Sequence, residues 1–311
     1  MRILMYGAGV IGSIFAGKLA QAGNEVTVLA RSTRYQQIKE QGIVLVQPKS
    51  RKIEQVSVAV IDVLRPDDRY DYLIVTMQRT QVDAILPVLS RNNSPNIVFV
   101  VNTAGGYESW AQAVGPQRLM IGFPAAGGER KNATVSYFIA KGMQRIFQTT
   151  TFGEYSQTKT KRVKILIKLF CRAGIPSVWS KHMDAWQKTH VGLVTNIANA
   201  LYGFDCDNVA LGHSRSDVRR MVDGIQESRK VLRSVGITPR PRKLIWMDLS
   251  PGVLTFLFRI FMRTELAQTT MAKHCSVAKP EMQYLQQEFD VLLSESHLET
   301  VAITCLKRNL S

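Results

Sequence analysis

The chain has few cysteines, no cysteine pair at metal-binding spacing and no apolar run long enough to cross a membrane. Its four cysteines, Cys171, Cys206, Cys275 and Cys305, lie far apart and form no CxxC motif. Scattered thiols are typical of reduced cysteines in a cytoplasmic protein, so we expect neither disulfides nor a metal site. An apolar, strand-like run begins at residue 3, so we expect no signal peptide.

Acidic residues are also scarce, with 24 Asp and Glu against 40 Lys and Arg, a formal net charge of +16. Such an excess is typical of nucleic-acid-binding proteins, but these basic residues are dispersed and no run interleaves them with aromatics. We interpret most as solvated helix faces whose positive field attracts anionic ligands, and expect neither nucleic acid nor a membrane as partner. The most apolar late segment, 252–258, meets Arg259 and Arg263 too soon to span a bilayer, which indicates a buried helix.

A glycine pattern near the N-terminus is the most informative motif present. Gly7, Gly9 and Gly12 follow an apolar run, and a helical pattern comes directly after them. In dinucleotide-binding folds these glycines allow a tight turn, approach of the pyrophosphate to the backbone, and close packing of the helix on the sheet. The free N–H groups of the helix start, here around Val10 and Ile11, favour an anion. The pattern predicts a dinucleotide site; the alternative is a tight turn without a ligand.

The residue after the second predicted strand, 25–30, bears on the choice of dinucleotide. NAD sites usually place Asp or Glu there to accept a hydrogen bond from the ribose 2′-hydroxyl. This chain has Arg31 at that position, with Arg34 nearby. A guanidinium can bind a 2′-phosphate in bidentate fashion and offers the hydroxyl no acceptor. We therefore expect NADP(H) rather than NAD as the cofactor.

Strand and helix patterns alternate through the first half of the chain, and helical periods dominate from residue 183 onward. We expect strands at 72–76, 97–101, 119–122, 134–140 and 145–152, and helices at 80–89, 156–173, 186–202, 217–235, 253–273 and 280–293. This order predicts an α/β fold with two domains. Residues 1–179 form a Rossmann-type, doubly wound sheet that binds NADP(H), and residues 180–311 form an all-helical, substrate-binding domain.

Candidate catalytic residues follow a predicted strand or lie on predicted helices of the second domain. Asn102 directly follows the strand at 97–101, so it either hydrogen-bonds the nicotinamide or a substrate oxygen, or belongs to an ordinary turn. Lys188 and Asn196 lie roughly on one helix face, two turns apart. On physical grounds alone, Lys188 and Glu265 are equally typical of solvated surface residues.

The chain resembles the ketopantoate reductase family, NADPH-dependent enzymes that reduce 2-dehydropantoate to pantoate. The likeness covers nearly the full length, and its motifs occur in the order and spacing of the family. They are the glycine pattern at 7–12, Arg31, Asn102 with Gly105, Trp186-Gln187-Lys188, Asn196, and Thr264-Glu265. The resemblance implies a cytoplasmic oxidoreductase of pantothenate biosynthesis.

The resemblance also implies a mechanism in which NADPH delivers hydride to a substrate ketone. Lys188 matches the catalytic lysine of the family, which polarises the carbonyl and supplies the proton. Glu265 matches an acidic residue that contacts the substrate hydroxyl, and Asn196 a substrate-binding asparagine. Asn102 matches an asparagine near the nicotinamide and the substrate. Gln78 stands where many members have a lysine, and we expect it to contact the cofactor.

Several positions depart from the family pattern. Gly192 stands where a second asparagine is common, Val253 where a carboxylate-binding serine is expected, and residues 266–271 differ from the usual continuation. Lost polar partners weaken binding of the pantoate carboxylate and hydroxyls, since hydrogen bonds to charged groups contribute roughly 1.5–3 kcal/mol each. Three hypotheses stay open: reduction of 2-dehydropantoate or another 2-oxo acid, reduction of a more apolar ketone, and a non-catalytic NADP(H) sensor. A homodimer is also left open.

Overall fold

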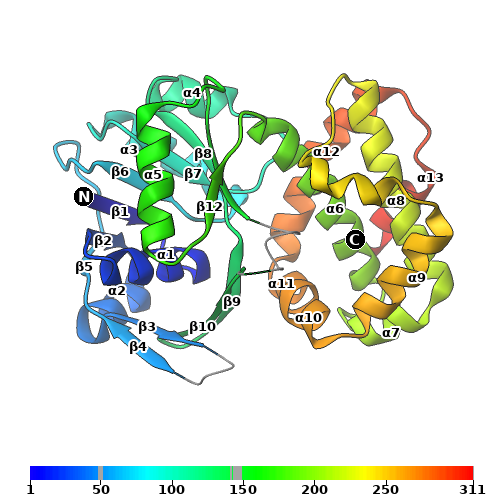
Figure 1. Cartoon of the computed structure of the whole chain (residues 1–311), viewed down its shortest axis with the longest axis horizontal. Helices are drawn as coiled ribbons and strands as arrows, with labels where there is room; N and C mark the ends of the chain where they lie inside the picture. Colours follow the sequence, from blue (N-terminus) through cyan, green and yellow to red (C-terminus); the bar gives the residue numbers. More distant parts are fainter. Residues whose placement is uncertain (48–51, 141, 143–148, 311) are drawn as a thin grey trace. The chain divides into compact units, whose positions relative to one another are not determined.

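The computed structural model describes residues 1–47, 52–140, 142 and 149–310 (Figure 1). The chain divides into two compact units. The first comprises Met1–Val101 and Tyr107–Met183, and the second comprises Asn102–Gly106 together with the chain from Asp184 onward. We expected residues 102–106 within the first domain. They cluster with the second unit instead, because Thr103 and Ala104 hydrogen-bond to Glu288.

The first unit is built on an eight-stranded sheet in the order β12-β11-β8-β7-β6-β1-β2-β5. Its strands are β1 Arg2–Tyr6, β2 Glu25–Leu29, β5 Ala59–Ile61, β6 Tyr72–Val75, β7 Ile97–Val100, β8 Leu119–Phe123, β11 Thr150–Glu154 and β12 Ser177–Trp179. The strands from β5 across to β8 are mutually parallel, whereas β11 runs antiparallel to β8. The order β5-β2-β1-β6-β7-β8 is that of a Rossmann-type doubly wound sheet, which confirms the predicted fold class.

Continuous apolar runs form the central strands of this sheet. Every residue of β6 and β7 is buried, and so are residues 3–6 of β1, as expected for parallel strands covered on both faces. The strands predicted at 25–30, 72–76, 97–101 and 119–122 are confirmed as β2, β6, β7 and β8. Of the strand predicted at 145–152, residues 145–148 lie outside the described residues, and β11 begins at Thr150.

Five α-helices accompany the sheet in the described part of the first unit: α1 Val10–Gln21, α2 Ser32–Gln41, α3 Leu86–Arg91, α4 Glu108–Val114 and α5 Lys161–Arg172. The helix predicted at 80–89 is wrong in its first half. Two 3₁₀ turns, η1 Arg79–Gln81 and η2 Asp83–Ile85, precede α3. Pro87 lies in the first turn of α3, and because proline has no backbone N–H, an α-helix that began before it would be interrupted there. The helix predicted at 156–173 begins only at Lys161, after its N-cap Thr160.

A second, four-stranded sheet has the order β4-β3-β10-β9. Its strands are β3 Ile43–Val46, β4 Ile53–Val56, β9 Ala126–Lys131 and β10 Thr134–Ile139, of which the sequence predicted only β10. Gly17 of α1 allows close contact with this sheet, since a Cβ there would lie 2.8 Å from the Leu45 side chain. Lys18 of α1 pairs with Glu54 of β4 at 2.5 Å. The small sheet is therefore anchored on α1.

Residues 184–310 are all described and contain no strand, which confirms a helical second half. Its helices are α6 Met183–Tyr202, α7 Asn208–His213, α8 Arg215–Ser234, η4 Arg242–Asp248, α9 Pro251–Met262, α10 Glu265–Ala267, the π-helix η5 Gln268–Ala272, α11 Lys273–Val277, α12 Lys279–Ser296, α13 Val301–Lys307 and η6 Arg308–Leu310. Buried apolar side chains of α6, α8 and α12 form much of its core. Their amphipathic spacing explains why these three helices were predictable.

The helix predicted at 253–273 is broken. α9 ends at Met262, and Thr264 caps the next helix by accepting a hydrogen bond from the Ala267 N–H. α9 is also less buried than expected, because Phe256 is 63% exposed and Val253, Leu257 and Ile260 share its exposed face. Among the described residues, no single helix has the length and apolar composition of a membrane span; the bent pair η4 and α9 meets those two criteria jointly.

Candidate active site

The glycine turn follows β1 and has a different constraint at each glycine. Gly7 has a φ of +116°, and a Cβ there would overlap the carbonyl oxygen of Thr76. A Cβ at Gly12 would overlap the carbonyl oxygen of Gly7 itself. A Cβ at Gly9, by contrast, would meet nothing within 4 Å. The outer glycines are therefore required by the fold of the turn, whereas Gly9 borders open space.

Helix α1 begins at this turn with its first N–H groups available. Gly9 is the N-cap residue, supplies no side-chain cap, and no acidic residue lies in the first turn. The N–H groups of Val10, Ile11 and Gly12 have no partner within the helix by geometry, and the helix dipole favours an anion beside them. The arrangement matches the phosphate-binding start of a dinucleotide-fold helix.

Arg34 holds the glycine turn in place, a role the sequence did not reveal. Its Nε donates to the carbonyl oxygen of Ala8 at 3.2 Å, one terminal nitrogen donates to Ser13 Oγ at 2.9 Å, and the other to the carbonyl oxygen of Ala133 at 3.0 Å. The side chain is buried, and burial together with the nearby charge of Arg130 lowers its pKa to about 10. Arg34 is thus engaged by the protein itself.

Arg31, in contrast, is exposed. It lies two residues after the end of β2 and is the N-cap residue of α2. Its guanidinium is close enough to Tyr6 to lower the pKa of that hydroxyl, although burial has the larger, opposite effect and raises it overall. Of the two arginines near the end of β2, Arg31 is the one that solvent or a ligand can reach.

Gln78 lies at the same edge of the sheet as the glycine turn. Tyr6 of β1 pairs with Val75 of β6, so the chain leaves both strands at one edge. Thr76 donates a hydrogen bond to the Gly7 carbonyl oxygen at 3.1 Å, and Gln78 is exposed two residues later. The predicted cofactor residues of the first unit therefore all follow β1, β2 or β6, at their carboxyl ends.

Lys188 lies on the second turn of α6. Its Nζ donates to Asp184 Oδ2 at 2.9 Å, and 15% of its side chain is exposed. Trp186 and His190 stack on the same helix, with ring centroids 5.7 Å apart. Loss of hydration lowers the pKa of His190 to about 3, with the charge of His274 acting in the same direction. His190 is therefore neutral at pH 7.

Asn196, for which we predicted substrate binding, lies in the interior of the second unit. It is buried, and its Nδ2 donates to the Gly192 carbonyl oxygen at 2.7 Å and to Ser228 Oγ at 2.9 Å. Gly224 of α8 faces it so closely that a Cβ there would overlap Asn196 Oδ1. The side chain is thus enclosed between α6 and α8. Residue spacing predicts which helix face Asn196 lies on, but it does not predict which element packs against that face.

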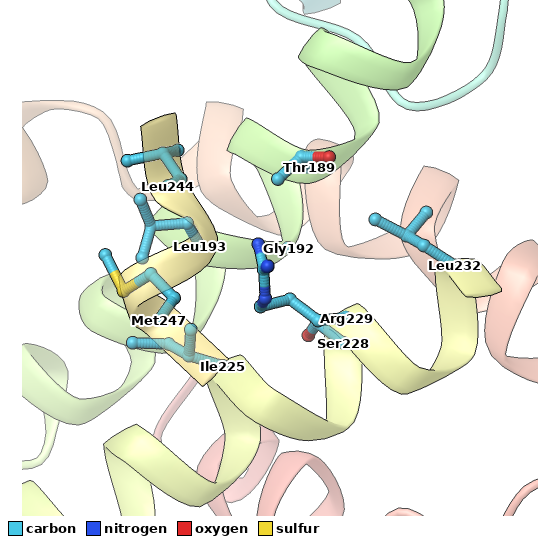
Figure 2. A pocket seen from close by; sticks show the side chains of 9 residues that line it. All are labelled: Thr189, Gly192, Leu193, Ile225, Ser228, Arg229, Leu232, Leu244 and Met247. Carbon is cyan, nitrogen blue, oxygen red and sulfur yellow. The ribbon is translucent and has the colours of Figure 1, made fainter. Parts of the chain in front are cut away.

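Gly192, the site of a departure from the family pattern, also lies in a packed interior. A Cβ there would come within 2.9 Å of the Ser228 Cβ and 3.1 Å of the Phe289 ring. Figure 2 shows the small pocket beside it, where Leu193, Leu244 and Met247 line one part. The pocket accommodates no more than about one water molecule. Helix packing, and not a ligand, therefore occupies the space that an asparagine would need.

Glu265 is the first residue of the short helix α10, and it is exposed. After it the chain enters the π-helix η5, where Thr269 and Thr270 donate hydrogen bonds to the carbonyl oxygens of Glu265 and Leu266. π-Helical turns interrupt α-helices often at functional sites. The departure from the family pattern at 266–271 thus coincides with a local change of helix type.

The loop that carries Asn102 is held by α12. Thr103 Oγ1 and the Ala104 N–H both donate to Glu288 Oε2, at 2.9 and 2.8 Å, and the Gly105 N–H donates to Thr103 Oγ1 at 3.1 Å. Asn102 itself is half-buried, and its side-chain amide makes no hydrogen bond to the described residues. Asn102, Lys188 and Glu265 therefore belong to the second unit, whereas the glycine turn, Arg31 and Gln78 belong to the first.

Comparisons with known proteins place this site in context. Residues 3–157 match the family model described as ketopantoate reductase PanE/ApbA. The 2-dehydropantoate 2-reductase of Halobacterium salinarum is 25% identical over 243 residues, which cover 76% of this chain and 77% of that protein.

Solved structures share the fold over the full length of the chain. The 2-dehydropantoate 2-reductase of Geobacter metallireducens has a TM-score of 0.82 at 14% identity, covering 100% of this chain and 99% of that one. A D-mandelate dehydrogenase bound to NADH and anilino(oxo)acetate has a TM-score of 0.79 at 17% identity, covering 100% and 97%. With its matching motifs, its two-unit fold and these relatives, the chain belongs to the ketopantoate reductase PanE/ApbA family of oxidoreductases.

Proposed function

We propose that this protein is an NADPH-dependent reductase of a 2-oxo acid, with 2-dehydropantoate as the first candidate substrate. The observation that carries the proposal is the glycine turn: open space at Gly9, a helix start free of acidic residues and an exposed Arg31 after β2. These are the features that a dinucleotide pyrophosphate and a 2′-phosphate require. Family membership adds the reaction type.

The residues present fit NADP(H). The N–H groups at the start of α1 would bind the pyrophosphate, and Arg31 would bind the 2′-phosphate, since Arg34 is already engaged by Ala8, Ser13 and Ala133. Gln78, exposed after β6, offers an amide to the same ligand. When bound, the reduced nicotinamide supplies the hydride that converts a ketone carbon into an alcohol carbon.

Lys188 would act on the substrate oxygen. Its ammonium donates a hydrogen bond to the ketone, stabilises negative charge that develops on the oxygen and then transfers a proton to it. Asp184, one helical turn earlier, accepts a hydrogen bond from the ammonium at 2.9 Å, which limits the rotamers of Lys188. Glu265, exposed at the start of α10, would accept a hydrogen bond from a substrate hydroxyl, and Asn102 would bind a substrate or nicotinamide oxygen.

A more apolar 2-oxo acid is the second candidate substrate. Val253 stands where the family pattern has a carboxylate-binding serine and offers no hydroxyl, and residues 266–271 depart from the usual continuation after Glu265. Substrate polar groups therefore meet fewer partners than the family pattern provides. The similar proteins include both kinds of enzyme: one is a 2-dehydropantoate 2-reductase and another is a D-mandelate dehydrogenase. Both candidate substrates therefore belong in the test.

The test is NADPH oxidation by the purified protein with 2-dehydropantoate and a panel of aliphatic and aromatic 2-oxo acids. We expect turnover with at least one acid, its loss in Lys188→Ala, and its retention in Lys230→Ala, which removes an exposed lysine of α8. NADPH binding should persist in both variants. Undiminished turnover in Lys188→Ala would remove the role given to Lys188. Tight NADPH binding without turnover on any acid would favour a non-catalytic sensor.

A further inference from the structure

Glu288 joins two parts of the sequence that lie far apart. Its carboxylate lies on α12 and accepts two hydrogen bonds on one oxygen, from Thr103 Oγ1 and from the Ala104 backbone. The loop with these donors is 184 and 185 residues earlier in the chain. Nothing in the local pattern of α12 requires a carboxylate there, because the helix is stabilised by its buried face of Met282, Leu285 and Phe289.

The contact organises the whole loop and not one residue. Thr103 Oγ1 donates a hydrogen bond to Glu288 and accepts one from the Gly105 N–H. Gly105 is therefore held by Glu288 indirectly, through the Thr103 hydroxyl. Thr103 and Ala104 are almost fully buried. Gly105 passes so close that a Cβ would lie 3.0 Å from Glu288 Oε1. Three consecutive residues after Asn102 are thereby fixed relative to α12.

We propose that Glu288 is a positioning residue that holds the Asn102 loop for the reduction. The inference rests on the proposed function, because it assigns the Asn102 amide to the substrate or the nicotinamide. A charged acceptor makes shorter and stronger hydrogen bonds than a neutral one, so the carboxylate restricts the backbone next to Asn102 more tightly than an ordinary turn would. Catalysis is sensitive to such placement, since small displacements of a binding group cost large factors in rate.

The test compares Glu288→Ala, Glu288→Gln, Thr103→Val, Asn102→Ala and the double variant Asn102→Ala/Glu288→Ala. Glu295→Ala is the control, because it removes an exposed carboxylate further along α12. We expect Glu288→Ala and Thr103→Val to lower kcat at least about tenfold, with NADPH affinity within about threefold of wild type. Glu288→Gln retains an oxygen acceptor but loses the charge, so its kcat should lie between those of wild type and Glu288→Ala. The double variant should be no slower than Asn102→Ala, since both changes act through one side chain.

Two results would overturn the inference: a kcat of Glu288→Ala within about twofold of wild type, or losses that multiply in the double variant. If the wild-type protein reduces no 2-oxo acid, the proposed function fails. Hydrogen exchange of the backbone amides then tests separately whether Glu288 anchors the loop. Glu288→Ala should then accelerate exchange of the Ala104 and Gly105 amides at least about tenfold, and Glu295→Ala should not. Unchanged exchange in Glu288→Ala would refute the anchoring role without reference to activity.

Discussion

Arg34 Nε donates a hydrogen bond to the Ala8 carbonyl oxygen, 3.2 Å away, in the middle of the glycine turn. The same guanidinium reaches Ser13 in α1 and Ala133 between β9 and β10. One buried side chain from α2 therefore connects the turn, the helix that follows it and the small sheet. An arginine beside a nucleotide-binding turn is usually assigned to phosphate, but here the geometry assigns Arg34 to the scaffold.

Replacing Arg34 by alanine should destabilise the first unit. The Ala8 and Ala133 carbonyls and the Ser13 hydroxyl would lose their donor in a buried setting, where each unsatisfied group costs about 1–3 kcal/mol. We expect the free energy of unfolding to fall by about 2–4 kcal/mol, measured by chemical denaturation. Lys39→Ala, which removes an exposed cation from the same helix, should change it by less than about 0.5 kcal/mol. Equal effects of the two substitutions would show that Arg34 has no scaffold role.

Arg31→Ala should discriminate between the two nicotinamide cofactors. If the exposed guanidinium binds the 2′-phosphate, its loss weakens NADPH binding at least about tenfold and NADH binding by no more than about twofold. Isothermal titration or fluorescence titration of both nucleotides measures this directly. Arg69→Ala is the control, because it removes an exposed positive charge elsewhere in the same unit. A parallel loss of NADPH and NADH affinity would contradict the 2′-phosphate assignment.

Gly192→Ala should destabilise the helical unit. The added Cβ would lie 2.9 Å from the Ser228 Cβ and 3.1 Å from the Phe289 ring, and overpacking of this kind costs about 1–3 kcal/mol. Gly252→Ala in α9 is the matched control, since its Cβ would meet nothing within 4 Å. There the better helix propensity of alanine should raise stability by up to about 1 kcal/mol. Thermal unfolding of both variants checks the pair, and a higher Tm for Gly192→Ala would show that the helices separate easily.

Stability should fall on acidification because of His190. Its pKa is lowered from 6.5 to about 3 in the folded protein. Between these pH values the unfolded chain binds a proton that the native chain does not. The free energy of unfolding therefore decreases as the pH falls below 6.5, by at most about 1.4 kcal/mol per pH unit from this group, and is unaffected above it.

His190→Gln should make the acid dependence of unfolding shallower. Denaturant titrations at a series of pH values between about 7 and 5 give the slope for wild type and variant. His274, whose pKa is also lowered by loss of hydration, remains in the variant and leaves part of the slope in place. Identical slopes in the two proteins would mean that His190 is protonated as readily in the folded chain as in the unfolded one.

The features predicted correctly are those that local sequence determines. The glycine turn could be identified because the positive φ of residue 7 favours glycine. The strands β6 and β7 could be identified because burial on both faces requires a continuous run of apolar residues. The small sheet was largely missed, since β3 and β4 have only four residues each, and β9, with the sequence AGGERK, has no apolar alternation. Such strands are specified by their partners and by α1, and not by their own periodicity.

The contacts of Asn196, Arg34 and Glu288 could not be predicted, because they join residues far apart in the sequence. Asn196 lies on the predicted helix face, but Ser228 and Gly224 of α8 decide that this face is interior. Arg34 reaches Ala133, 99 residues away, and Glu288 reaches Thr103, 185 residues away. A pattern of residue types in one segment contains no information about these partners. Helix assignments failed for a related reason at 263–264, where the Thr264 cap outweighs an otherwise continuous apolar period.

The three glycines of the turn differ in their surroundings, so substitutions there can separate an effect on folding from an effect on ligand binding. Side chains at Gly7 or Gly12 would collide with the backbone of the turn, so a loss of function there cannot be separated from misfolding. Gly9 has φ and ψ of −70° and −164°, which any amino acid adopts, and it borders open space. A methyl group at Gly9 would therefore leave the protein folded and extend only into the open space beside the turn. If the proposed function is correct, Gly9→Ala should weaken NADPH binding without lowering the stability of the fold.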